Sequence, residues 1–133
     1  GEEMGLQGSN YFAGHLPDGF TKVVAMFNLD MEGEGDGAWC GLSAEPPSLR
    51  EAVEKANQEI NIVRGISVMR RVGVRGSDFA PFFLKGIPVV SLGSNGPHLA
   101  YHAQGDTIYR LNPEIMGAIA RVSFLSIYYL AQK

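Results

Sequence analysis

Residues 22–29 read KVVAMFNL, and this stretch decides the fold class. Val23 to Phe27 form an unbroken apolar run that includes β-branched side chains. Such a run is typical of a strand that is covered on both faces, as in a parallel or mixed sheet between helices. Asp30 follows the run directly, where a strand would end.

Helical patterns lie further along the chain. The clearest covers residues 48–60, where Ser48 and Glu51 have capping-box spacing and apolar residues form one stripe. A last helix is predicted from Asn112-Pro113-Glu114, which combines a cap, a first-turn proline and an acidic residue, to about residue 131. That helix is apolar around most of its circumference, so we expect more protein than this chain supplies to cover it. Its charged and small residues argue against a membrane span.

The segments between these elements complete the expected order. We predict a short helix closed by the turn Pro17-Asp18-Gly19, a glycine-rich loop over 32–47, strands over 66–74 and 87–92, and a helix over 78–85 capped by Ser77 or Asp78. The alternation of helices and buried strands predicts an α/β sandwich.

Composition narrows the class of protein. The chain has 133 residues, of which 45% are hydrophobic and 19% charged, which fits one globular domain rather than a disordered or fibrous chain. The net charge of −3 and the lack of a basic cluster argue against nucleic-acid binding. A single cysteine, Cys40, excludes an internal disulfide framework and a multi-cysteine zinc site.

The polar residues best placed for chemistry are the pair Glu2-Glu3, Asp30 at a strand end, and His102 in a late loop. In α/β sheets, ligands collect beyond the carboxyl ends of strands, and carboxylate and imidazole are zinc ligands. The residue types alone leave other interpretations open, because Glu2 and Glu3 could be solvated charges and Asp30 could cap a turn. The sequence contains no HExxH, CxxC, GxSxG or Walker motif.

Four segments, in order along the chain, resemble those of the di-zinc aminopeptidases of peptidase family M28, a group that includes glutamate carboxypeptidases, glutaminyl cyclases and the transferrin-receptor ectodomain. GEEMGLQGS (1–9) is similar to (A/G)EExGLxGS, and NLDMEG (28–33) to NLDMIG. RGSDFAPFFLKGIPVV (75–90) is similar to GSDHxPFxxxGIPxx, and YHAQGDT (101–107) to YHTPxDT. The resemblance implies a mixed, largely parallel sheet between helices.

The resemblance also implies roles for individual residues. Glu2 would be the general acid/base, which takes a proton from a zinc-held water and delivers it to the leaving amine. Glu3 and His102 would serve one zinc ion and Asp30 the other, with two ions in the intact domain. Tyr101 would polarise the substrate carbonyl and stabilise the oxyanion.

Asp106 would not bind the metal itself but would contact the ligand His102 and help to orient it. Phe79 stands where the family has a histidine that is not a ligand.

The family's HxD segment and bridging aspartate, which precede the glutamate pair, have no counterpart here. Residues 1–133 therefore resemble the C-terminal portion of one catalytic domain. We expect the missing N-terminal part to be a partner of this chain, and the exposed flank to favour self-association. For the chain alone we expect weak metal binding and no peptidase activity.

The function predicted for the intact domain is a zinc-dependent aminopeptidase that acts on peptides. Two alternatives remain: a glutaminyl-cyclase type of acyl transfer, and a non-catalytic relative used for binding. The compartment is left open, because the sequence shows no targeting segment and the resemblance covers only part of a domain.

Overall fold

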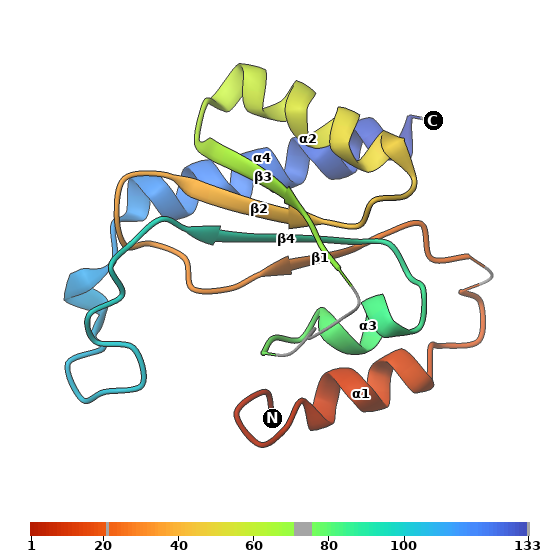
Figure 1. Ribbon diagram of the computed structural model, residues 1–133, viewed down its shortest axis with the longest axis horizontal. Helices are drawn as coiled ribbons and strands as arrows, with labels where there is room; N and C mark the ends of the chain where they lie inside the picture. The colour runs from red at the N-terminus through yellow and green to blue at the C-terminus, as the bar shows by residue number, and fades with distance from the viewer. Residues whose placement is uncertain (21, 71–75, 133) are drawn as a thin grey trace.

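The apolar run after residue 22 leads into the first strand of a four-stranded sheet. The computed structural model describes residues 1–20, 22–70 and 76–132, and Figure 1 shows their arrangement. The strands are β1 (Met26–Leu29), β2 (Ala38–Leu42), β3 (Val63–Val68) and β4 (Val89–Ser94). The helices are α1 (Gln7–Gly14), α2 (Pro47–Ile60), α3 (Ala80–Leu84) and α4 (Pro113–Ala131), with a short 3-10 helix, η1, at Ile108–Arg110.

The sheet is mixed, with the strand order β1-β4-β2-β3. β1 pairs with β4 and β2 pairs with β3 in parallel, while β2 and β4 run antiparallel. Every residue of β4 is buried, as expected of a strand in the middle of a sheet. β1 and β3 lie at the two edges.

Helices cover both faces of the sheet (Figure 1). Side chains alternate along a strand, so neighbouring residues of β4 enter different cores. Val90 and Leu92 pack with residues of α2 and α4, such as Leu49 and Ile119. Val89 packs on the other face, with residues of α1 and α3 such as Phe82. The predicted α/β sandwich is confirmed.

The prediction of one long loop over residues 32–47 is wrong, because β2 (Ala38–Leu42) lies within it. β2 is hydrogen-bonded on both sides, to β3 and to β4, and Ala38, Cys40 and Leu42 are buried. The partners that make this segment a strand come from distant parts of the chain. Local glycine content therefore concealed it.

Two predicted helix caps are wrong and one is confirmed. α2 begins one residue earlier than expected, with Pro46 rather than Ser48 at its N-cap. α3 begins at Ala80, and neither Ser77 nor Asp78 caps it. The Asn112 side chain accepts a hydrogen bond from the backbone N–H of Glu114 at 2.9 Å, as the Asn-Pro-Glu signature predicts.

The two remaining strand predictions differ from the structure in their bounds. The strand expected over 66–74 is β3 (Val63–Val68), and residues 71–74 of that prediction lie outside the described residues. The strand expected over 87–92 is β4 (Val89–Ser94), two residues further along.

α4 buries one side and exposes the other. Ile115, Ile119 and Val122 are buried against the sheet and α2, whereas Phe124 and Tyr128 are exposed. Among the described helices, α4 is the one long and apolar enough to cross a membrane, with a mean hydropathy of 1.3 over 18 residues. A third of that window is buried inside the protein, and core helices of globular proteins can meet the same criterion.

Candidate metal centre

Two of the predicted metal ligands meet although they come from opposite ends of the chain. Glu3 Oε1 lies 2.8 Å from His102 Nε2, and both side chains are more than half exposed, at 69% and 52%. The Tyr101 ring stacks on the His102 ring, with centroids 3.8 Å apart and planes inclined by 21°. An imidazole and a carboxylate at the surface thus point at one another beside an aromatic ring.

The backbone is strained at two places in this region. His102 has φ +54°, and Met31, which follows Asp30, has φ +58°. Residues other than glycine adopt this left-handed conformation uncommonly, although histidine does so more often than methionine. It costs about 1–3 kcal/mol for a residue held in it. Strain of this kind gathers at sites where function requires a particular side-chain direction.

Asp30 is held at the carboxyl end of β1 by a chain of polar side chains. Ser77 Oγ donates a hydrogen bond of 2.6 Å to Asp30 Oδ2. Asn28 Nδ2 donates in turn to Ser77 Oγ at 3.0 Å and to Ser91 Oγ at 3.3 Å. Asn28, Ser77 and Ser91 are all buried, so this chain fixes the direction of a carboxylate that is itself partly exposed.

The backbone of Asp30 is fixed as well. Asp30 N donates to Leu92 O of β4 at 3.1 Å. A Cβ atom at the next residue, Gly93, would lie 2.6 Å from Asp30 O, so only glycine allows β4 to pass this close.

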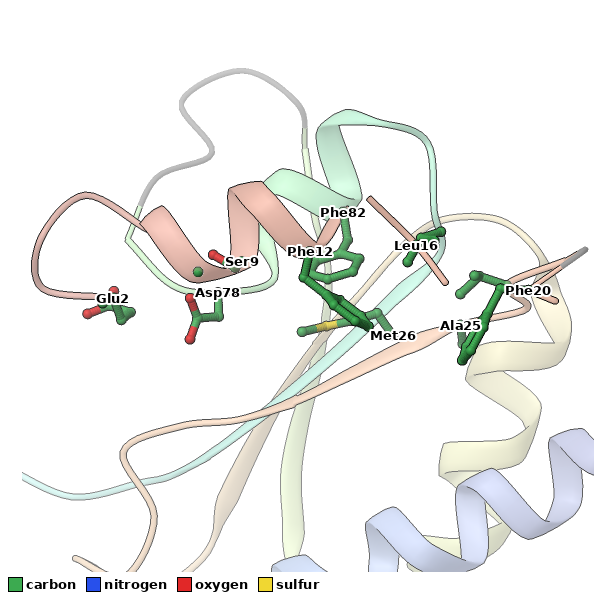
Figure 2. A pocket seen from close by; sticks show the side chains of 12 residues that line it. Glu2, Ser9, Phe12, Leu16, Phe20, Ala25, Met26, Asp78 and Phe82 are labelled. Carbon is green, nitrogen blue, oxygen red and sulfur yellow. The ribbon is translucent and has the colours of Figure 1, made fainter. Parts of the chain in front are cut away.

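Glu2 lies at one end of a cavity that has a volume of about 510 Å³. Figure 2 shows Glu2, Asp78 and Ser9 at one end of it and Leu16 and Phe20 at the other. The walls between them are apolar, with Phe12, Phe82 and Met26. This cavity lies between α1 and α3 on one side and β1 on the other (Figure 2). The outer edge of β1 pairs with no described strand.

Asp106 does not contact His102 through a hydrogen bond in the part of the chain that the structure describes. Its backbone N–H donates to Ala103 O at 3.0 Å, and the residue lines a cavity together with Tyr101 and Glu32. Its role as a partner of His102 stays a prediction.

The sequence patterns missed three polar residues around Asp30. Ser77 was expected only as a possible helix cap, Asn28 had no expected role, and Glu32 was expected only as a residue of the glycine-rich loop. Burial and the negative charge of Asp30 raise the pKa of the Glu32 carboxyl. Asn28 was the one sign in the sequence that polar partners gather here, because an amide inside an apolar strand must find buried hydrogen-bond partners.

The donor types fit zinc, which binds carboxylate oxygen and imidazole nitrogen. The structure brings Glu3 and His102 into one pair and holds Asp30 apart from it. Across residues 1–20, 22–70 and 76–132, no three His, Cys, Asp or Glu side chains form a group that could hold a metal ion. A four-coordinate zinc ion would therefore need donors besides these.

The sequence model of peptidase family M28 matches residues 1–127. The chain belongs to peptidase family M28. This confirms the resemblance read from the four segments. No curated protein gives a significant match.

Solved structures with the same fold include several aminopeptidases. The LapA aminopeptidase of Legionella pneumophila is 23% identical with a TM-score of 0.79, and the match covers 100% of this chain and 38% of that one. The zinc aminopeptidase BSAP of Bacillus subtilis is 22% identical with a TM-score of 0.75, covering 96% and 33%. An aminopeptidase of Aneurinibacillus sp. strain AM-1 is 23% identical with a TM-score of 0.78, covering 96% and 31%.

At these identities the likeness shows the fold. The chain spans about a third of the length of these structures.

Proposed function

We propose that this chain is part of a zinc-dependent exopeptidase, an aminopeptidase that hydrolyses the first peptide bond of its substrate. The observation that carries the proposal is the convergence of Glu3 and His102 at 2.8 Å, beside Tyr101, in a member of family M28. Carboxylate and imidazole are the donor types expected at such a centre. The aminopeptidases of the same fold support it.

In this proposal Glu3 and His102 hold one zinc ion, and Asp30 contributes to a second. Zinc supplies Lewis acidity, which activates water and polarises the peptide carbonyl. Ser77 and Asn28 keep the Asp30 carboxylate in a fixed direction.

The proton steps belong to Glu2. Its carboxylate accepts a proton from the attacking water and delivers it to the leaving amine. The Tyr101 hydroxyl donates a hydrogen bond to the oxygen that gains charge as the carbonyl carbon becomes tetrahedral.

The centre also needs donors that these residues do not supply. We propose that they come from the rest of a catalytic domain, which lies along the free edge of β1. Three observations support this arrangement: β1 pairs only with β4 among the described strands, an apolar cavity runs beside it (Figure 2), and the related structures are about three times as long. Glu2 lies at the polar end of that cavity. The rest of the domain, if placed against this cavity, would therefore reach the centre.

The experiment compares the full-length protein with residues 1–133, using leucine p-nitroanilide as substrate. We expect the full-length protein to hydrolyse it, to lose activity to a chelator and to regain it with zinc. Glu2→Gln should lower kcat by about 100- to 10,000-fold, whereas Glu45→Gln, at an exposed glutamate in the loop before α2, should have no effect. Residues 1–133 alone should be inactive.

Chelator-resistant hydrolysis, or equal activity of Glu2→Gln and wild type, would contradict the proposal. A product that has lost ammonia instead of gaining water would replace hydrolysis by cyclisation.

A further inference from the structure

A cavity of about 320 Å³ lies next to the proposed centre and is separate from the one at Glu2. Tyr101 and Met31, neighbours in sequence of His102 and Asp30, form part of its wall. Ala100 and Leu111 add apolar surface. Its acidic residues are Glu32, Glu34 and Asp106.

Two carboxylate oxygens at this cavity lack a partner. Glu32 Oε1 and Glu34 Oε2 are buried and accept no hydrogen bond from any described residue. His98 Nδ1 lies 3.5 Å from Glu34 Oε2, which is too long for a strong hydrogen bond. Buried carboxylate oxygens are normally satisfied, so two orphans at one cavity indicate that a donor belongs there.

The charges at the cavity do not balance. Glu34 Oε1 accepts a hydrogen bond of 3.3 Å from Arg110 Nη1, which pairs one carboxylate. Within the described residues, Glu32 and Asp106 form no ion pair with Lys or Arg. Three acidic side chains thus line the cavity, and the structure gives an arginine partner to one of them, Glu34. A positively charged group of a ligand placed in this cavity would be stabilised by the other two.

Glu34 and Glu32 differ in what else they do. Glu34 ties its loop to β4, because its backbone N–H donates to Ser94 Oγ at 3.2 Å and its side chain meets Arg110. Glu32 has no such task among the described contacts. It also stands where the NLDMIG segment of the family carries an apolar residue. Glu32 is therefore the carboxylate available to a ligand.

We propose that this cavity binds the cationic side chain of the substrate's first residue, so that the enzyme selects peptides beginning with lysine or arginine. The methylene stem would lie along Met31, Ala100 and Leu111, and the charged end would reach Glu32 Oε1 and Glu34 Oε2. The shared wall at Tyr101 would then place the scissile carbonyl beside Glu3 and His102. This inference rests on the proposed aminopeptidase function.

The first test measures binding to residues 1–133 and needs no catalysis. Lysinamide and norleucinamide have the same α-amine, amide and stem, and only lysinamide has the terminal ammonium. In protein with carbon-13 methionine methyl groups, lysinamide should shift the Met31 signal saturably and leave that of Met4, which lines neither cavity, in place. Norleucinamide should bind at least roughly tenfold more weakly.

Glu32→Gln should remove most of this preference, lowering lysinamide affinity by roughly tenfold. Asp36→Asn changes an exposed acid of the same loop that does not line the cavity, and it should bind as wild type does. Equal binding of the two amides to wild type, no Met31 shift, or equal losses in both variants would overturn the inference. The comparison of the two amides on wild type remains decisive even if Glu32→Gln does not fold.

The second test measures kcat/KM of the full-length enzyme for lysine and norleucine p-nitroanilides. We expect a preference for lysine of at least roughly tenfold that Glu32→Gln abolishes. Hydrolysis without that preference would overturn the inference and leave the proposed function standing. Selective binding of lysinamide with no hydrolysis of any anilide would instead contradict the proposed function.

Discussion

Ser77 has the clearest structural reason to matter among the residues that the sequence patterns did not assign to the centre. It accepts a hydrogen bond from Asn28 and donates one to Asp30. Ser77 therefore links the Asp30 carboxylate, which is partly exposed, to a buried side chain that holds it in one direction. Ser77→Ala should free that carboxylate to rotate. Replacing a residue that hydrogen-bonds to a metal ligand typically lowers the affinity for the metal by about 10- to 100-fold.

We therefore expect Ser77→Ala to weaken zinc binding at the proposed Asp30 site of the full-length protein by a factor in that range, measured by competition with a chromogenic chelator. Ser67→Ala, on β3 and away from Asp30, is the matched control. An unchanged affinity in Ser77→Ala would mean that Asp30 is positioned by its backbone alone.

Cys40 provides a test of the core by pH. It is 1% exposed, and burial raises the pKa of its thiol from 9.0 to about 12. The unfolded chain ionises its thiol first as pH rises, so the folded state loses stability between about pH 9 and pH 12. The loss attributable to this group is about 1.4 kcal/mol for each pH unit in that window.

Urea unfolding of wild type and Cys40→Ala over this range should show the difference. Lysine and tyrosine ionisation affects both proteins and cancels in the comparison. Equal pH dependence of the two unfolding free energies would show that the thiol reaches water in the folded state.

At the scale of the elements, β4 is the strand on which the centre depends. It lies in the middle of the sheet and accepts the backbone hydrogen bond of Asp30. In Gly93→Ala the new methyl group would lie 2.6 Å from Asp30 O and 2.9 Å from Trp39 Nε1. Overpacking of this kind costs about 1–3 kcal/mol.

We expect Gly93→Ala to lower the unfolding free energy by that amount in urea denaturation. The matched control is Gly65→Ala in β3, where a new methyl group would meet no heavy atom within 4 Å. Equal effects of the two substitutions would contradict the close approach of β4 to Asp30.

The predictable elements share a strong local signal. α2 has an apolar stripe, α4 has the Asn-Pro-Glu start and a largely apolar circumference, and β1 lies within an apolar run, although hydrogen bonding limits the strand to Met26–Leu29. β2 lacked such a signal, because residues distant in sequence, in β3 and β4, complete it.

The same division holds for the site. Motif resemblance pointed to Glu3 and His102, which the structure brings together, but it could not reveal that Ser77 serves Asp30 instead of capping α3. That contact depends on the tertiary fold.

At the scale of the whole molecule, the flank at β1 should make residues 1–133 associate with themselves. Phe20 and Val24 are 58% and 57% exposed there, next to a strand edge without a described partner. Exposed apolar edges of this kind pair with other chains. We expect a concentration-dependent dimer in sedimentation equilibrium, which Val24→Lys should weaken strongly.

Val68→Lys is the matched control, since Val68 is 48% exposed on β3 at the opposite edge. If wild type stays monomeric, or if both variants dissociate alike, the β1 flank is not the association surface.

The central claim is that Glu3 and His102 form one end of a zinc centre, and residues 1–133 allow it to be tested directly. The measurement is a zinc titration followed by NMR of the imidazole signals of the three histidines, His15, His98 and His102. We predict that His102 responds first, with weak affinity, and that Glu3→Gln lowers this affinity by roughly tenfold. A response of His15 or His98 at the same zinc concentration, or an unchanged affinity in Glu3→Gln, would contradict the account.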